Sequence, residues 1–180
     1  AWTVKGVRPD LPVVFLVKDP AVLDEMKPED TSHVDRVFLW ENESSLLLAI
    51  IKNIEDAMNV EHDTSLGRVR VILVVEDSVR QYSTFLPQMY TILMDMTRRL
   101  ISRGLNHTHK QLRMRSRAKI LLVDNYESAV EIIEKYKPYL LGLVTDLCFW
   151  KNGQLDNRAG FSLIEHAKEV RFNLPICMQT

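Results

Sequence analysis

Cysteine and long hydrophobic runs are both scarce in this chain of 180 residues. Its two cysteines, Cys148 and Cys177, are too few for a disulfide framework or a typical zinc site. Both lie in or beside apolar runs, which predicts buried, reduced thiols in a cytoplasmic protein. No apolar run reaches the roughly 18 residues that a membrane-spanning helix needs, and no signal peptide is visible. A membrane protein is therefore not expected.

Strong charge of one sign is also lacking. The formal net charge is −1, which argues against a general nucleic-acid binder. The hydrophobic content of 46% and charged content of 26% are typical of a globular protein that buries one ample core. The chain does not begin with methionine, and we expect it to be part of a longer protein.

Short apolar runs alternate with amphipathic segments along the chain. This alternation predicts a doubly wound α/β fold, a parallel sheet with helices on both faces. The pattern predicts a polar linker at 60–68, and Pro87 is expected to kink or split the helix that contains it. Expected strands are 11–17, 34–40, 70–76, 119–124, 139–146 and 174–179, and expected helices are 44–59, 78–104, 126–136 and 160–170.

Three acidic residues follow two of the apolar runs. Asp146 ends the run that starts at Tyr139, and Glu76 and Asp77 end the run that starts at Arg70. The carboxyl ends of parallel strands form the edge where open α/β sheets bind ligands. Three carboxylates at that edge would suit a hard cation such as Mg²⁺. A simpler interpretation of Asp146 is that it caps a turn or the next helix.

The segment 98–119 contains eight lysines and arginines and no acid. Such a block suits phosphates or an acidic partner, but a solvated connector is commoner, so nucleic-acid binding is not expected. His107 and His109 have no cysteine or carboxylate beside them, which argues against a metal site. The apolar stripe of the 78–104 helix has two interpretations: packing against the sheet, or pairing with a second copy in a homodimer. It comprises Met89, Ile92 or Leu93, Met96, Leu100 and Ile101.

Two stretches near the ends of the chain are similar. Residues 7–13 and 170–176 match at five positions when Val13 and Ile176 are counted as similar, and both lead into an apolar strand. This similarity suggests an internal duplication. We predict that residues 1–62 are the second half of one unit and that residues 63–180 are the first part of the next.

These motifs resemble the receiver domain of two-component response regulators. The resemblance implies a five-stranded doubly wound sheet of order 2-1-3-4-5, either permuted or with one half from a tandem receiver. Ile72–Asp77 resembles the first strand with its metal-binding acid pair, and Val144–Asp146 resembles the third strand with its phosphoacceptor. Thr180 falls at the switch hydroxyl position, and residues 11–62 resemble the fourth strand to fifth helix of a receiver.

The run 119–124 also resembles a first strand, but the chain from Asp124 to Asp146 has room for only one crossover. The first-to-third-strand path needs two, so we assign 70–77 as the first strand. The leading half-unit departs from the family, with Glu41 at the lysine position and Val17 at the switch position. The trailing unit's lysine would lie beyond Thr180. The long first helix is also similar to receiver-like regions ahead of phosphoenolpyruvate-synthase-type domains.

The resemblance implies a regulatory phosphoacceptor rather than an enzyme, located in the cytoplasm. Asp146 would accept a phosphoryl group from a sensor histidine kinase or phosphotransfer protein, with Mg²⁺ held by Glu76, Asp77 and Asp146. The alternative is a pseudo-receiver that serves only for dimerisation or regulation of an attached domain. A small phosphohydrolase is a third hypothesis, but it would need a second aspartate two residues after the nucleophile, where this chain has Cys148.

Overall fold

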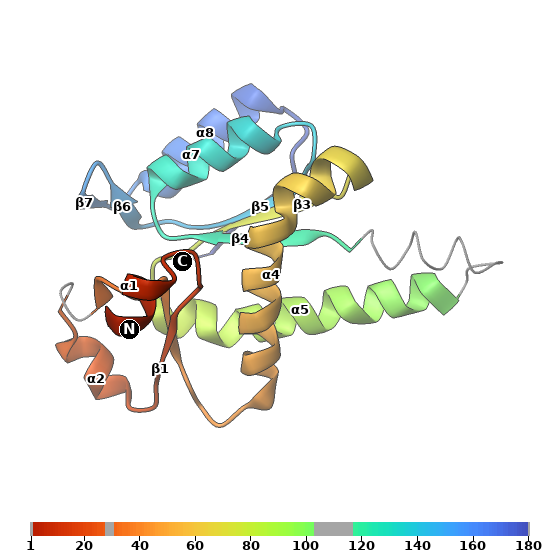
Figure 1. The fold of residues 1–180 in the computed structure, drawn as a ribbon. Helices are drawn as coiled ribbons and strands as arrows, with labels where there is room; N and C mark the ends of the chain where they lie inside the picture. Colours follow the sequence, from red (N-terminus) through yellow and green to blue (C-terminus); the bar gives the residue numbers. More distant parts are fainter. Residues whose placement is uncertain (1, 28–30, 103–116, 180) are drawn as a thin grey trace.

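The computed structural model describes residues 2–27, 31–102 and 117–179 (Figure 1). Its main sheet has four parallel strands in the order β4-β3-β5-β8. The strands are β3 (Val71–Val75), β4 (Lys119–Val123), β5 (Leu140–Asp146) and β8 (Ile176–Gln179). The predicted parallel sheet is therefore confirmed, whereas the five-strand order stays a prediction.

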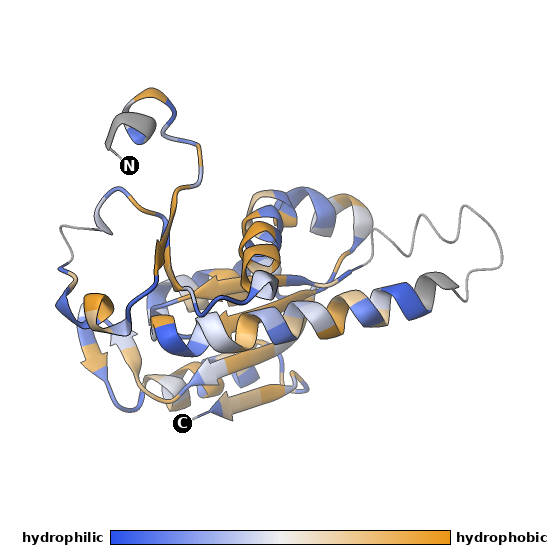
Figure 2. Cartoon of the chain, turned by 90° about the horizontal axis from the view of Figure 1, so that it is seen from below, coloured by the Kyte–Doolittle hydropathy of each residue, from blue (hydrophilic) through white to orange (hydrophobic). Residues whose placement is uncertain are grey.

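Helices cover both faces of this sheet. Figure 1 shows α7 (Tyr126–Tyr136) and α8 (Ala159–Val170) on one face, and α4 (Ser44–Gly67) and α5 (Val79–Ser102) on the other. Each face has its own hydrophobic core: Leu73 and Leu143 point toward α7 and α8, and Val74 points toward α4 and α5. Because both faces are covered, the strands are apolar almost throughout, which Figure 2 shows as continuous orange segments.

The first strands do not join the main sheet. β1 (Val14–Val17) and β2 (Arg36–Leu39) form a separate parallel pair, with the short helices α1 (Trp2–Val7) and α2 (Pro20–Glu25) nearby in sequence. The permuted alternative, in which the strands expected at 11–17 and 34–40 would complete the main sheet, is therefore wrong. Two side chains of α5 hydrogen-bond to the backbone of β2. Ser83 Oγ accepts from the Leu39 N–H at 3.0 Å, and the Tyr82 hydroxyl donates to the carbonyl of Val37.

The predicted boundaries of the two long helices need correction. α4 continues to Gly67, so residues 60–67 are helical rather than a polar linker, and the helix crosses the predicted unit boundary at residue 62. It ends at Arg68, whose φ of 49° is left-handed. α5 is one continuous helix through Pro87 and is not split. Its later turns run past the edge of the sheet (Figures 1 and 2).

A short hairpin follows Asp146, between the strands expected at 139–146 and 174–179. β6 (Phe149–Lys151) and β7 (Gln154–Asp156) pair antiparallel through Asn152 and Gly153. Both turn residues have positive φ, 51° and 73°, which is the geometry that Asn-Gly turns favour. The dipeptide was therefore a signal for this hairpin that the sequence interpretation missed. Among the described residues, no helix combines the length and apolar character needed to span a membrane.

Candidate functional site

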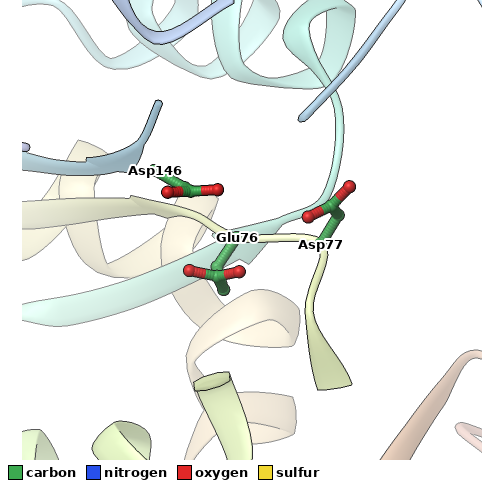
Figure 3. Close-up of side chains that lie close together, drawn as sticks. All are labelled: Glu76, Asp77 and Asp146. Carbon is green, nitrogen blue, oxygen red and sulfur yellow. The ribbon is translucent and has the colours of Figure 1, made fainter. Parts of the chain in front are cut away.

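The strand order brings the three predicted acids together. Glu76 and Asp77 directly follow β3, Asp146 is the last residue of β5, and β3 and β5 are neighbours in the sheet. One carboxylate oxygen from each residue lies within 4.8 Å of the other two. Figure 3 shows Asp77 and Asp146 on either side of the strand end, with Glu76 between and below them. β4 is not adjacent to β5, which confirms that 70–77, rather than 119–124, supplies the strand beside Asp146.

Glu76 is the most constrained of the three. Glu76 is only 1% exposed. Its backbone N–H donates to the carbonyl of Val123 at 2.9 Å. The backbone N–H of Ser78 donates to Oε1 at 3.0 Å, and Gln179 Nε2 donates to Oε2 at 2.8 Å. Both carboxylate oxygens therefore have a donor, as a buried carboxylate requires.

Burial and neighbouring negative charges raise the pKa of Glu76 and of Asp77. Burial raises the pKa of Glu76, opposed by the Ser78 N–H, and the negative charge of Asp146 raises it further. Burial is also the main cause of the raised pKa of Asp77, and the charges of Asp146 and Asp124 add to it. The cluster thus concentrates negative charge in a partly desolvated place, where a cation would relieve the repulsion.

Asp146 sits where two chain segments pass close together. Its carboxylate Oδ2 accepts from the Cys148 N–H at 3.4 Å, and the buried Thr145 hydroxyl donates to its carbonyl oxygen at 2.9 Å. Gly160, in the first turn of α8, donates its N–H to the carbonyl of Leu147 at 3.0 Å. A Cβ at Gly160 would lie 2.4 Å from the Asp146 carbonyl oxygen, so only glycine allows this approach.

Two residues near the site were missed by the sequence interpretation. Asp124 follows β4 and, together with Asp77, lines a hollow of about 410 Å³ that also includes Trp150 of the hairpin. The available signal was its position, because Asp124 ends an apolar run as Asp146 does. Gln179, the last residue of β8, is the second missed residue, and nothing in its local sequence indicated contact with Glu76.

The donor set fits a hard divalent cation. Carboxylate oxygens are the ligands that Mg²⁺ prefers, and Mg²⁺ sites commonly use one or two carboxylates together with water. Asp77 and Asp146 are half-buried, so a cation bound by them could also keep water ligands. Glu76 is buried and would bind the same cation from the interior side. The three clustered carboxylates and their crowded negative charge therefore suit a hard divalent cation.

Other predicted residues have different outcomes. Thr180, His107 and His109 lie outside the described residues. In the described part of the basic block, Arg117 and Lys119 form ion pairs with the buried Asp56. Both cysteines are free thiols, as predicted, but Cys177 is exposed and Cys148 is only half-buried, so the prediction that both are buried is wrong.

No family model, curated protein or solved structure matches the chain.

Proposed function

We propose that the chain is a phosphoacceptor receiver module in which Asp146 takes a phosphoryl group with the help of Mg²⁺. The observation that carries the proposal is the convergence of Glu76, Asp77 and Asp146 within 4.8 Å at the carboxyl end of a parallel sheet. The strand order β4-β3-β5-β8 agrees with strands 2-1-3-4 of the order implied by the receiver resemblance. The donor would be a sensor histidine kinase or phosphotransfer protein in the cytoplasm.

The proposed reaction transfers a phosphoryl group from an atom of the donor to a carboxylate oxygen of Asp146. A carboxylate oxygen of Asp146 forms a bond to phosphorus while the bond from phosphorus to the donor's leaving atom breaks, which leaves a mixed anhydride on Asp146. Mg²⁺ would offset the negative charge of the phosphoryl oxygens. Glu76 and Asp77 would hold this cation, and the Cys148 N–H would keep the Asp146 carboxylate oriented. The product is a signal rather than a released compound, so we class the module as regulatory and not as an enzyme.

The proposal is tested by incubating the protein with acetyl phosphate and Mg²⁺ and measuring intact mass. We expect the wild-type chain to gain one phosphoryl group and Asp146→Asn to gain none. Asp95→Asn is the matched control, because Asp95 is an exposed aspartate of α5 that pairs with Arg98 and is not one of the clustered acids. It should still gain the group. No gain in the wild type, or an equal gain in Asp146→Asn, would contradict the proposal.

A second candidate is a pseudo-receiver that acts through association alone. The observation in its favour is the apolar surface on α5, where Ile92 is 60% and Met96 is 56% exposed while Met89 and Leu93 pack against the core. On this hypothesis the chain gains no phosphoryl group and forms a homodimer that Met96→Lys dissociates. Sedimentation velocity of the wild type and this variant, beside the mass measurement, separates the two functions.

A further inference from the structure

One hydrogen bond spans the sheet in front of the phosphoacceptor strand. Gln179 belongs to β8 and Glu76 follows β3, and β5 lies between these two strands. The bond from Gln179 Nε2 to Glu76 Oε2 is 2.8 Å long. It therefore connects the two strands that flank Asp146 without using the backbone of either.

The register of the strands explains this contact. Gln179 is the partner of Asp146 in the β5–β8 pair, and Val75 is the partner of Thr145 in the β3–β5 pair. Glu76 therefore falls beside Asp146 when the register is continued by one residue. Glu76, Asp146 and Gln179 form a row across three adjacent strands, and side chains in such a row point to the same face of a parallel sheet.

Glu76 needs such a partner more than an aspartate would. Its longer side chain has one more rotatable bond, and both neighbouring carboxylates repel it. The Ser78 N–H is a backbone donor that fixes one oxygen. Among the described residues, Gln179 is the side chain that donates to the other oxygen. Without that donor, the buried carboxylate would have an unsatisfied oxygen, which is costly. The side chain would then favour a rotamer that points away from Asp77 and Asp146.

We infer that Gln179 is a positioning residue for the cation site: it holds the Glu76 carboxylate in the orientation from which Glu76, Asp77 and Asp146 bind a divalent cation together. The inference rests on the proposed function and specifies how its cation site is assembled. Residues that hydrogen-bond to metal ligands typically alter metal affinity about 10–100-fold when they are removed. Gln179 thus makes cation binding at the β3–β5 edge depend on the position of β8.

The test measures Mn²⁺ binding by the electron paramagnetic resonance signal of the free ion, a readout that does not depend on phosphoryl transfer. We expect one Mn²⁺ per wild-type chain and about 10–100-fold weaker binding by Gln179→Met, which keeps the side-chain length and removes the donor. Gln88→Met is the matched control, since Gln88 is exposed on α5. It should bind as the wild type does. Gln179→Asn, which retains an amide but is shorter, replaces Gln179→Met if that variant fails to fold, and it should also weaken binding.

A double-mutant comparison distinguishes positioning from a general structural role. In a Glu76→Ala background there is no Glu76 carboxylate for Gln179 to hold, so Gln179→Met should leave Mn²⁺ affinity unchanged. A change of up to about twofold counts as unchanged, because double-mutant comparisons usually carry an uncertainty of that size. An equal loss in both backgrounds, or unchanged or tighter binding by the single variant, would overturn the inference. If the wild type binds no Mn²⁺, or if Asp146→Ala binds it equally well, the proposed cation site fails and the inference with it. If Asp146→Ala alone abolishes binding while Gln179→Met does not weaken it, only the inference fails.

Discussion

Replacement of Asp56 by alanine should be among the most destabilising single changes in the chain. Asp56 lies on α4 and is fully buried. Its carboxylate accepts hydrogen bonds from the Tyr90 hydroxyl at 2.9 Å and from the Ile120 backbone N–H at 2.9 Å. Arg117 donates to both of its oxygens, and Lys119 Nζ is 3.4 Å away. One side chain thus joins α4 to α5, to β4 and to the segment before β4.

The magnitude follows from what the truncation leaves behind. Removing one partner of a buried ion pair typically costs about 3–5 kcal/mol, because the other charge stays buried without compensation. The Arg117 side chain is only 12% exposed and cannot readily reach water. The Tyr90 hydroxyl and the Ile120 N–H also lose their acceptor, at about 1–3 kcal/mol for each buried group left unsatisfied. Lys119 keeps its ion pair with Asp63 at 2.7 Å, so we count no loss there.

We therefore expect Asp56→Ala to lower the free energy of unfolding by at least about 3 kcal/mol. At about 2–4 °C per kcal/mol for a chain of this size, the Tm should fall by roughly 6 °C or more. Urea unfolding followed by circular dichroism, with the m value compared between variants, measures the change directly. Glu55→Ala is the control: Glu55 precedes Asp56 and pairs with Lys52 at the surface, which is worth less than about 1 kcal/mol. A loss for Asp56→Ala no larger than that of the control would refute the reasoning.

Two further changes test the site. Gly160→Ala should lower stability by about 1–3 kcal/mol, because its Cβ would lie 2.4 Å from the Asp146 carbonyl oxygen, and the urea midpoint should fall accordingly. The control Ser162→Ala, two residues later on α8, should change the midpoint little. An unchanged midpoint for Gly160→Ala would contradict the packing. The pKa of Asp77 is raised in the folded state, chiefly by burial, so the folded state holds this proton more tightly than the unfolded state does. The metal-free protein should therefore lose stability as pH rises from the unfolded carboxyl value of about 4 through the higher folded pKa. Asp77→Asn, which has no such proton to lose, should have a higher Tm than the wild type at pH 7. Mg²⁺ at about ten times its Kd should stabilise the wild type by about 1.4 kcal/mol, which raises the Tm by about 3–6 °C. The same Mg²⁺ concentration should raise the Tm of Asp77→Asn much less. Equal shifts in Tm would show that Asp77 is not a ligand.

The sheet was predictable because its strands follow a simple pattern. Each is a short apolar run that ends in a polar residue, and a parallel sheet covered on both faces requires that composition. The acid site was predictable for the same reason: Glu76, Asp77 and Asp146 lie at the ends of their runs, and parallel strands bring such ends to one edge. Asp124 also ends an apolar run, but the pattern does not show how far its strand lies from β5; in the sheet, β3 lies between β4 and β5.

The orientation of α4 was not predictable from its apolar residues. The apolar residues that give the 44–59 segment its helical spacing are Leu47, Leu48, Ile50, Ile51, Ile54 and Met58. Ile50 and Ile54 pack in the core, but the structure leaves the other four exposed. The helix instead buries a face that carries several polar residues, Asn53, Asp56 and Thr64 among them. Hydrophobic periodicity cannot identify such a face, because its stability comes from long-range partners.

These buried polar partners explain why α4 crosses the predicted boundary between units. The Asn53 side-chain amide donates to the carbonyl of Ile120 at 3.2 Å, and Asp56 accepts from the same residue's N–H. Ile120 belongs to β4, so these hydrogen bonds join α4 to the main sheet. They fix the orientation of α4 on the sheet more specifically than apolar packing alone would. α4 therefore packs on the main sheet through residues on both sides of the predicted boundary at residue 62, from Asn53 to Thr64.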